Sequence, residues 1–360
     1  MSLLTYAIIA VIKSVVILFV LLTAVAYIVW LERKVVGHMQ NRWGPTRVGP
    51  FGLLQPLADG VKFILKEDLT PPHVYKPLFI LAPLLAVVLA LTSVAMIPFG
   101  ESVTIHGWTI PLQITGAVNA NGTLGDINIA LLILLGVTSI GVYGVALAGW
   151  SSNSKYSLLG SLRASAQMIS YELSLGLSLV GVLILAGTLS LRGIVNGQAG
   201  RWFPDIQWLS WVPHWFIFPQ IVGFFIYMIA AYAETNRIPF DLPEAETELV
   251  AGYHTEYSAM KFAMFFMAEY ANMVTVAFVA TLLFLGGWHG PHFGPPLLQA
   301  VLPFVWFLLK IFAFIFLYIW VRGTLPRFRY DQLMTFGWKV LLPLAIANVV
   351  VTSLIVALLS

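Results

Sequence analysis

Long apolar stretches recur along almost the whole chain, and they constrain its fold more than any other feature. A stretch of roughly 20 apolar residues crosses a bilayer as a helix, and about eight such stretches fit into this length. Because 59% of the 360 residues are hydrophobic and only 10% are charged, the composition differs strongly from that of soluble domains. The sequence therefore predicts an all-α, polytopic membrane protein. The expected spans are Thr5–Trp30, Pro77–Pro98, Ile127–Trp150, Arg163–Gly187, His214–Thr235, Lys261–Gly287, Gln299–Val321 and Phe336–Leu359.

Lysine and arginine fall on alternate loops between these spans. Of the 19 basic residues, all but four lie in one set of loops; Arg192 and Arg201 lie in the opposite set, and Lys13 and Lys310 lie within spans. The positive-inside rule places the basic loops in the cytoplasm and both termini outside. We therefore expect a multi-pass protein of a bacterial inner (plasma) membrane. Membrane orientation accounts for the net charge of +3, so nucleic acid is not an expected partner.

The absence of cysteine excludes thiolate chemistry in this chain. Without a single cysteine it cannot ligate an iron–sulfur cluster or a thiolate-bound metal, or form a disulfide. We expect no metal site and no redox cofactor bound by this chain alone.

The first basic loop, Leu31–Lys76, is too long for a simple turn. After the Gly/Pro-rich segment Gly44–Gly52, apolar residues recur at helical spacing, with Asp59, Lys62 and Lys66 between them. This pattern predicts an amphipathic helix lying at the membrane surface. A helix that only anchors the loop would have the same pattern. The apolar positions are Leu53, Leu54, Leu57, Val61, Ile64 and Leu65.

Carboxylates are concentrated between Ala233 and Tyr257. This window and the next span hold seven of the 16 acidic residues. A charge at the centre of a membrane helix costs about 2.5–3.5 kcal/mol on insertion scales, so carboxylates kept there usually serve an ion path, a ligand or a partner. A solvated acidic loop is the alternative, but apolar residues beside the charges favour a packed loop. The seven residues are Glu234, Asp241, Glu244, Glu246, Glu248, Glu256 and Glu269.

Local sequence in this window suggests how the carboxylates are arranged. Pro239 and Pro243 prevent a continuous helix, so we expect Glu234 to Leu242 to fold back as a loop. Glu244 and Glu248 are four residues apart, which on a helix gives a repulsive pair unless one is protonated or a cation is close. Closely placed buried carboxyls titrate as a coupled set and share protons near neutral pH.

Three charged residues inside the predicted spans can be placed by depth. Counting from the predicted cytoplasmic ends, Glu172, Glu269 and Lys310 lie at similar depth near mid-membrane. A proton path is the functional interpretation. The structural alternative is that Lys310 pairs with one of the two glutamates and holds helices together.

Four segments of the chain are distinctive: ERKVVGHMQNRWGPTRVGPFGLLQPLADGVKF, AETNRIPFDLPEAETELVAGYHTEYS, FFMAEYANM and VRGTLPRFRYDQLMTFGWKVLLP. Together they closely resemble the H-subunit family of respiratory complex I, the proton-pumping NADH:quinone oxidoreductase. The resemblance covers essentially the whole chain in order. It implies an eight-helix, H⁺-transporting translocase subunit, a single membrane domain over residues 1–360, with quinone as substrate. Loops 31–76 and 236–260 would form the quinone cavity.

The resemblance also implies partners and residue roles. The partners would be iron–sulfur and quinone-site subunits of the peripheral arm, small membrane subunits and antiporter-like subunits, together with membrane lipid. The quinone channel would use Glu32, Arg33, Lys34, Asp59, Lys62, Arg237 and Asp241. The proton path would use Glu172, Glu234, Glu244, Glu246, Glu256 and Glu269, to which depth adds Lys310. Arg322, Arg327, Arg329 and Asp331 would contact the redox arm, although Arg329 and Asp331 also read as a local ion pair.

Other functions remain as alternatives at this point. Related ferredoxin- and F420-linked complexes and membrane-bound hydrogenases use a similar subunit. A stand-alone secondary transporter would have Gly/Pro-broken helices at paired positions in two halves, and no such symmetry is visible. A purely structural membrane anchor would carry few intramembrane charges.

Overall fold

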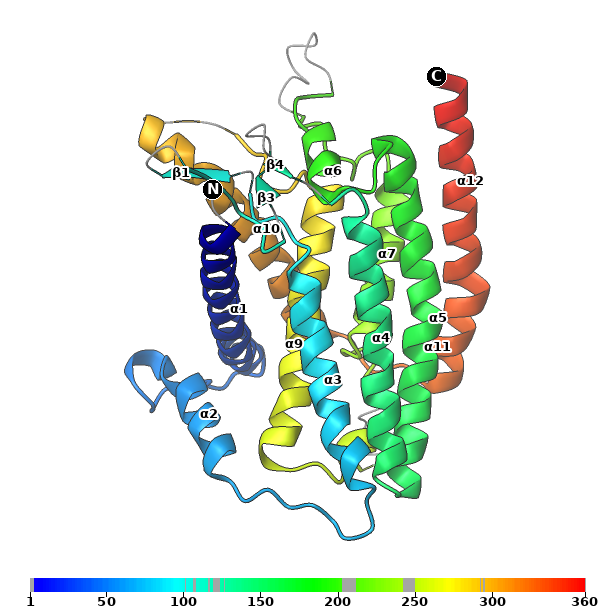
Figure 1. Ribbon diagram of the computed structural model, residues 1–360. Helices are drawn as coiled ribbons and strands as arrows, with labels where there is room; N and C mark the ends of the chain where they lie inside the picture. The colour runs from blue at the N-terminus through cyan, green and yellow to red at the C-terminus, as the bar shows by residue number, and fades with distance from the viewer. Residues whose placement is uncertain are drawn as a thin grey trace.

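The computed structural model is a bundle of long apolar helices (Figure 1). It describes residues 3–100, 102–105, 108–115, 117–118, 124–125, 127–202, 212–241, 250–291, 293 and 295–359. Within these residues, seven helices are long and apolar enough to cross a membrane, and α7 is a shorter apolar helix. The predicted all-α, polytopic membrane fold is confirmed.

The elements follow one another in the order below. The helices are α1 (Leu3–Met39), α2 (Gln55–Leu65), α3 (Lys76–Val94), α4 (Ala130–Ser151), α5 (Lys155–Ala186), α6 (Leu191–Gly197), α7 (Ile221–Glu234), α9 (Ala259–Phe284), α10 (Pro296–Thr324), α11 (Tyr330–Phe336) and α12 (Leu342–Leu359). Short turns of helix are η1 (Pro50–Gly52), η2 (Gly252–His254) and η3 (Gly337–Leu341), the last of which joins α11 to α12. Two antiparallel hairpins pair β1 (Ser102–Ile105) with β2 (Trp108–Pro111), and β3 (Ala117–Val118) with β4 (Leu124–Gly125).

Several predicted spans begin or end at the wrong residue, including the fifth, which begins at Ile221 and not at His214. The first and fourth differ most. The first helix does not end at Trp30 but continues to Met39, where Asn41 adopts a left-handed conformation with φ 56°. The fourth does not begin at Arg163 but at Lys155, just after Asn153 turns the chain with φ 49°. Both errors come from treating charge as the end of a helix, whereas helices continue beyond the apolar layer. The depth counted for Glu172 from Arg163 is therefore wrong, although Glu172 still lies near the middle of α5.

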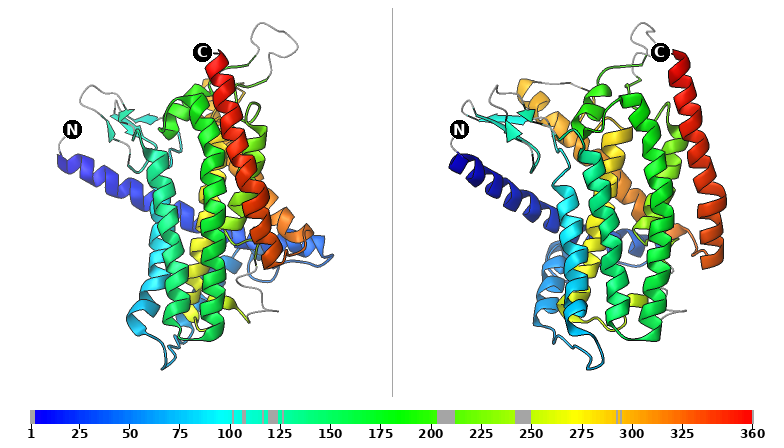
Figure 2. Two further views of the ribbon diagram at one scale, coloured as in Figure 1. Left: turned by 90° about the vertical axis from the view of Figure 1, so that its right-hand side faces the viewer. Right: turned by 45° about the vertical axis from the view of Figure 1, so that its right-hand side comes forward.

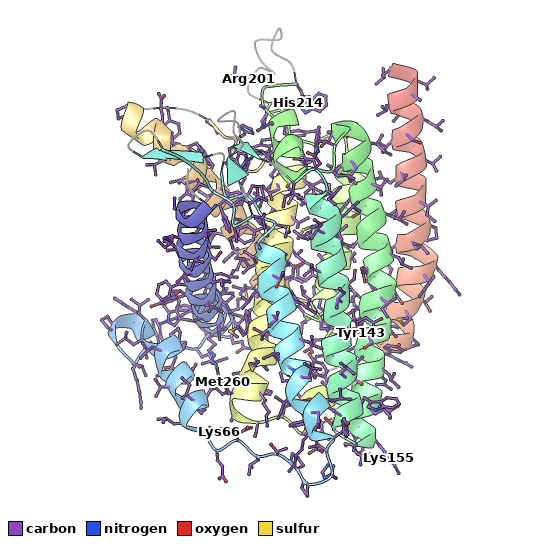
Figure 3. The ribbon with its side chains drawn as sticks, in the orientation of Figure 1. Lys66, Tyr143, Lys155, Arg201, His214 and Met260 are labelled. Carbon is purple, nitrogen blue, oxygen red and sulfur yellow. The ribbon has the colours of Figure 1, made fainter. Side chains whose placement is uncertain are left out.

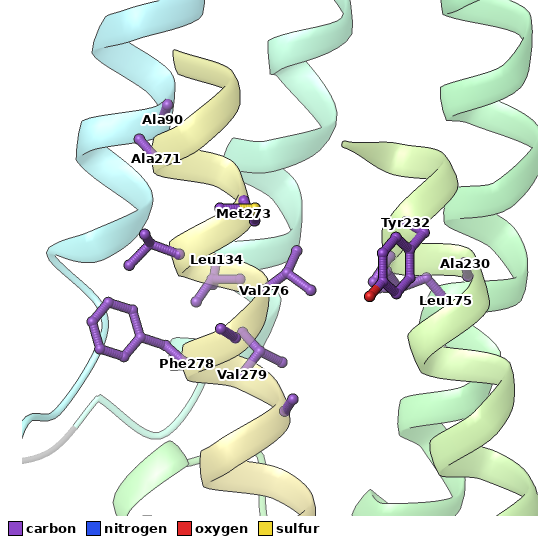
Figure 4. Packing of buried hydrophobic residues seen from close by; sticks show 14 of the residues in the cluster. Ala90, Leu134, Leu175, Ala230, Tyr232, Ala271, Met273, Val276, Phe278 and Val279 are labelled. Atoms are coloured by element: carbon purple, nitrogen blue, oxygen red, sulfur yellow. The ribbon is translucent and has the colours of Figure 1, made fainter. Parts of the chain in front are cut away.

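Helix α9 lies at the centre of the bundle. It packs against α3, α10 and α1. Helix α4 packs against both α3 and α5, and α7 packs against α5 (Figure 4). Small residues allow close approach, which drives helix association in membranes. A Cβ on Gly144 would meet the Ala86 Cβ at 3.2 Å, and one on Gly149 would meet the Ser161 Cβ at 2.3 Å.

The first and last helices lie at the edges of the bundle. Figure 2 shows α1 leaning away from the other helices and α12 running along the outside. Much of their apolar surface is exposed, as at Phe19 and Leu358. These faces suit a lipid or protein environment rather than water.

Basic residues gather at one end of the bundle, called here the basic end. Figure 3 shows Lys66 and Lys155 at this end and Arg201 with His214 at the other. The chain begins and ends on the side away from α2 (Figure 1). The alternation of loops therefore agrees with the pattern of charges in the sequence.

Candidate functional site

A cavity of about 460 Å³, called here the large cavity, lies between α1, α2, α9 and the end of α10. Most of its wall is apolar, and a smaller polar part brings together charged side chains. The lining residues are Leu22, Val25, Ala26, Val29, Trp30, Glu32, Arg33, Gln55, Pro56, Asp59, Gly60, Phe63, Phe262, Ala263, Phe266, Met267, Tyr270 and Arg322. Ligand pockets commonly have this size and this combination of apolar wall and few polar groups.

The amphipathic helix predicted from the first loop is present as α2 and forms one wall of this cavity. Arg33 on α1 donates to the Asp59 carboxylate across 2.8 Å, and the Gln55 amide donates to the other oxygen of Asp59 across 2.9 Å. Phe63 contacts Phe262 of α9 with ring centroids 6.5 Å apart. Arg33 and Asp59, both assigned to the quinone channel, therefore fasten α2 to α1.

A buried ion-pair network lies at the polar side of the large cavity. Arg237, in the turn after α7, places its Nε 3.0 Å from a Glu269 oxygen and its Nη1 3.5 Å from a Glu32 oxygen. Glu32 also accepts from Arg322 and, across 3.0 Å, from the Tyr270 hydroxyl. The Arg237 guanidinium carbon lies 4.0 Å from the centre of the Tyr270 ring, a cation–π contact.

These charges are almost completely removed from solvent. The exposed fractions of the side chains are 8% for Arg237, 10% for Glu32 and 12% for Glu269. Removing one partner of a buried ion pair costs about 3–5 kcal/mol, because the other charge is left uncompensated. The planar guanidinium also suits the geometry, since separate nitrogens reach carboxylates on two different helices.

A second, smaller cavity of about 40 Å³, called here the small cavity, lies between α3, α4, α5, α7 and α9. Glu234 and Glu269 both line it, with Asn236, Asn272, Thr138 and Thr235 among the polar neighbours. Since about 10–15 Å³ of such volume accommodates one water molecule, the small cavity has room for water between the two carboxyls.

Glu172 lies next to this cavity on α5. Its carboxylate accepts from the Ser139 hydroxyl of α4, and its charge and that of Glu234 repel each other. Two serines further along α5, Ser174 and Ser178, are also buried. Glu172, Glu234 and Glu269 therefore form a series of carboxyls running across the bundle.

Arg237 connects the two cavities. One of its partners, Glu269, lines the small cavity, whereas the other, Glu32, lines the large cavity. One guanidinium therefore contacts a carboxylate of each cavity.

The turn that carries Arg237 is itself fixed by buried polar contacts. Gln167 of α5 is fully buried, and its amide donates to the carbonyls of Ala233 and Phe240 across 2.8 and 2.9 Å. Asp241, predicted for the quinone channel, instead pairs with Arg327 across 3.0 Å, which ties this turn to the loop before α11. The predicted loop after Glu234 is confirmed as far as Asp241.

Several predicted residues lie away from both cavities in the part of the chain described. Lys34 approaches the Trp30 ring at 5.9 Å, and Lys62 is exposed on α2. Glu256 lies 4.0 Å from the His73 ring nitrogen. The ion pair predicted between Arg329 and Asp331 is present at 3.3 Å, with both side chains largely exposed. Glu244 and Glu246, with Glu248, lie outside the described residues.

Lys310 is a residue of α10, and its ammonium lies beside the C-terminal end of α9, on the side of the bundle opposite the basic end. Its ammonium donates to the carbonyls of Leu285, Gly287 and His289 across 2.6, 2.9 and 2.6 Å, and it lies 4.5 Å from the Trp215 ring. A cation there satisfies terminal carbonyls and complements the helix dipole. Among the described residues these are its partners, so the alternative pairing with Glu172 or Glu269 is wrong.

Some residues of the site were not predicted from the sequence. Tyr270 and Gln55 contact the charged groups directly, and Phe262 and Phe266 form the apolar wall. Tyr270 immediately follows Glu269, and Gln55 is one helical turn before Asp59. Their closeness in sequence to predicted site residues was the signal that could have identified them. Arg322, assigned to partner contact, pairs with Glu32 inside the site.

In the described residues, no three His, Asp or Glu side chains converge as a metal site. Glu32, Glu172 and Glu269 have cationic or hydroxyl partners instead.

Comparison with known proteins identifies the family. The model of the family described as NADH dehydrogenase matches residues 12–353. The chain is 71% identical to the NADH-quinone oxidoreductase H-subunit 2 of Koribacter versatilis over 99% of both chains. It is 54% identical to the NADH-quinone oxidoreductase H-subunit 2 of Geobacter metallireducens, over 96% of this chain and 94% of that one. With this coverage, the chain belongs to the family of NADH-quinone oxidoreductase H subunits, which are membrane subunits of complex I.

Proposed function

We propose that this chain is the quinone-channel and energy-coupling subunit of a proton-pumping NADH:quinone oxidoreductase. The large cavity would admit quinone, since its wall is apolar and its volume suits a substituted ring with part of an isoprenoid tail. Glu32, Arg33 and Asp59 would stand along the path of the quinone, with Tyr270 and Arg322 beside them.

One observation carries the coupling part of the proposal, namely that Arg237 bridges carboxylates of the two cavities. Reduction of quinone adds electrons and draws protons, so the charge near Glu32 changes. A stronger attraction of Arg237 toward Glu32 weakens its pairing with Glu269, and an unpaired buried carboxyl binds a proton more readily. Protons would then pass between Glu269, Glu234 and Glu172 through the small cavity.

The reaction needs electrons that this chain does not supply. Other complex I subunits are its partners, because its relatives are subunits of NADH-quinone oxidoreductase. We propose that iron–sulfur and quinone-site subunits of the peripheral arm dock at the basic end, near Arg327, Arg329 and Asp331. Small membrane subunits and antiporter-like subunits would flank the bundle, and no redox cofactor would be bound by this chain alone.

The orientation belongs to the same proposal. With the basic end in the cytoplasm and both termini outside, the protein would lie in a bacterial inner membrane. The peripheral arm would then receive NADH from the cytoplasm.

A photoreactive quinone analogue tests the assignment of the large cavity. In the purified complex, we expect labelled peptides from α2 and from the first half of α9, and substrate quinone should suppress the labelling. The variant Phe266→Trp, which fills part of the cavity, should lower labelling, whereas Phe19→Trp on the exposed face of α1 should leave it unchanged. Labelling of this chain only outside the large cavity would contradict the proposal.

A further inference from the structure

The wall of the large cavity formed by α2 is attached weakly to the bundle. None of the 11 residues of this fully described helix is buried. Its hydrophobic residues Leu57, Ile64 and Leu65 are strongly exposed. Apolar packing therefore cannot by itself fix where α2 lies, and its position depends on polar contacts and on the segments at its two ends.

The segment after α2, residues 66–75, is called here the strap. It crosses the basic end of the bundle in an extended path and joins α2 to α3 (Figure 1). Its far end is bound to α4, since the Tyr75 amide donates to the Ser151 carbonyl across 3.0 Å. The Asn153 side-chain amide donates to the His73 carbonyl across 3.2 Å.

The near end of the strap is bound to the first turn of α9. Lys261 places its ammonium 3.0 Å from the Asp68 carboxylate and 2.9 Å from the Thr70 hydroxyl. Beside it, the Leu69 amide donates to the Ser258 hydroxyl across 3.1 Å. Three consecutive strap residues are thereby tied to one point of α9.

The position of Lys261 is informative because a cation in the first turn of a helix is opposed by the helix dipole. Its side chain is nevertheless only 13% exposed and lies 5.1 Å from the centre of the buried Phe79 ring. The contacts with the strap give this unfavourable placement a structural reason.

We propose that Lys261 is a positioning residue for the quinone reaction: it latches the strap to α9 and so sets how closely α2 covers the large cavity. The pair Arg33–Asp59 holds α2 near its middle, and the Lys261 contacts hold the chain just after its last residue. This inference rests on the proposed function of the large cavity as the quinone site.

Breaking the latch should loosen α2 without touching the charged network around Arg237. In Lys261→Met we expect the apparent KM for quinone to rise about three- to tenfold, the effect of losing one ordinary hydrogen bond on an equilibrium, because Asp68 is half exposed and its charge is partly screened. We expect kcat to change less than about twofold. Lys261→Arg should restore most of the affinity. Lys155→Met is the matched control, because Lys155 is an exposed lysine in the first turn of α5 at the same end.

A covalent tie distinguishes a latch from a general loss of folding. The chain has no native cysteine, so Leu69→Cys with Ser258→Cys introduces a single pair at the point of attachment. In the Lys261→Met background, oxidation of this pair should return the KM to the normal value, and reduction should raise it again. Persistence of the high KM in the cross-linked complex would overturn the proposal.

A distance measurement makes the latch testable without quinone. Spin labels at Lys62→Cys on α2 and Tyr143→Cys on α4 should give a broader distance distribution in Lys261→Met. An unchanged distribution overturns the latch. A broader distribution with an unchanged KM also overturns this inference, and photolabelling of the large cavity then decides separately whether the proposed function still holds.

Discussion

Replacing Arg237 with glutamine tests the buried bridge between the two cavities. The substitution removes the guanidinium that lies 3.0 Å from Glu269 and 3.5 Å from Glu32, while a shorter polar side chain remains. Glu32 keeps Arg322 and Tyr270, so most of the loss falls on Glu269. We expect the purified complex to lose stability.

The structure sets the scale of this loss. Breaking a buried pair costs about 3–5 kcal/mol, and the partners still held by Glu32 reduce it. Protonation sets an upper limit on this loss of stability, because an unpaired carboxylate can bind a proton instead of staying charged. Neutralising a carboxyl with an ordinary pKa near 4.3 at pH 7 costs about 3.7 kcal/mol. A net loss of about 2–3 kcal/mol remains, which as a kinetic barrier corresponds to about 30- to 160-fold faster thermal dissociation of the complex.

A double-mutant cycle isolates the pair. Thermal dissociation is followed on native gels for the original chain, Arg237→Gln, Glu269→Gln and the double variant. Once Glu269 is neutral, removal of Arg237 should cost at least about 1 kcal/mol less, because residues in one ion-pair network are coupled. Additive effects of the two substitutions would refute the reasoning.

Three further predictions follow from the placement of individual side chains. Glu234→Gln and Glu269→Gln should each lower quinone-linked proton pumping in vesicles while the complex still assembles, because glutamine keeps the shape of glutamate but has no carboxyl to bind and release a proton. Normal pumping by either variant would remove that residue from the proton path. Arg33→Ala should raise the quinone KM about three- to tenfold, since it releases Asp59 of α2. Reduction of the iron–sulfur clusters by NADH should stay unchanged. Stopped-flow kinetics measure the cluster reduction, and steady-state kinetics measure the quinone KM. Lys310→Gln should lower the thermal stability of the complex by about 1.5–3 kcal/mol without changing the pumping ratio, because its ammonium binds three carbonyls in the turn after α9. A lower pumping ratio at normal stability would support its predicted place in the proton path.

Much of the fold could be predicted because membrane helices are specified by local composition. Apolar length located the spans, and the spacing of Leu57, Val61 and Ile64 located α2. Helix ends were less predictable, as the continuation of α1 to Met39 shows, because charged residues are good helix formers once they lie beyond the apolar layer.

The site was only partly predictable because its groups come from distant parts of the chain. The sequence placed Glu269 inside a span, and the family resemblance assigned Glu32 and Arg237 to the quinone channel. Neither indicated that the Arg237 guanidinium joins the two glutamates. Depth along separate helices suggested that Lys310 was near Glu269, whereas the ammonium lies at the far end of α9. Depth gives one coordinate, and contacts depend on how helices pack around one another.

The most direct test of the coupling mechanism is the ratio of protons pumped to electrons transferred in proteoliposomes containing Arg237→Lys. Lysine keeps the charge but has a single ammonium, which cannot present separate nitrogens to Glu32 and Glu269 in the same geometry. We predict that NADH-driven quinone reduction continues while the ratio falls by at least about half. Arg329→Lys, in an exposed ion pair, should leave both quantities unchanged. A normal ratio in Arg237→Lys would contradict the claim that Arg237 transmits quinone reduction to the carboxyl series.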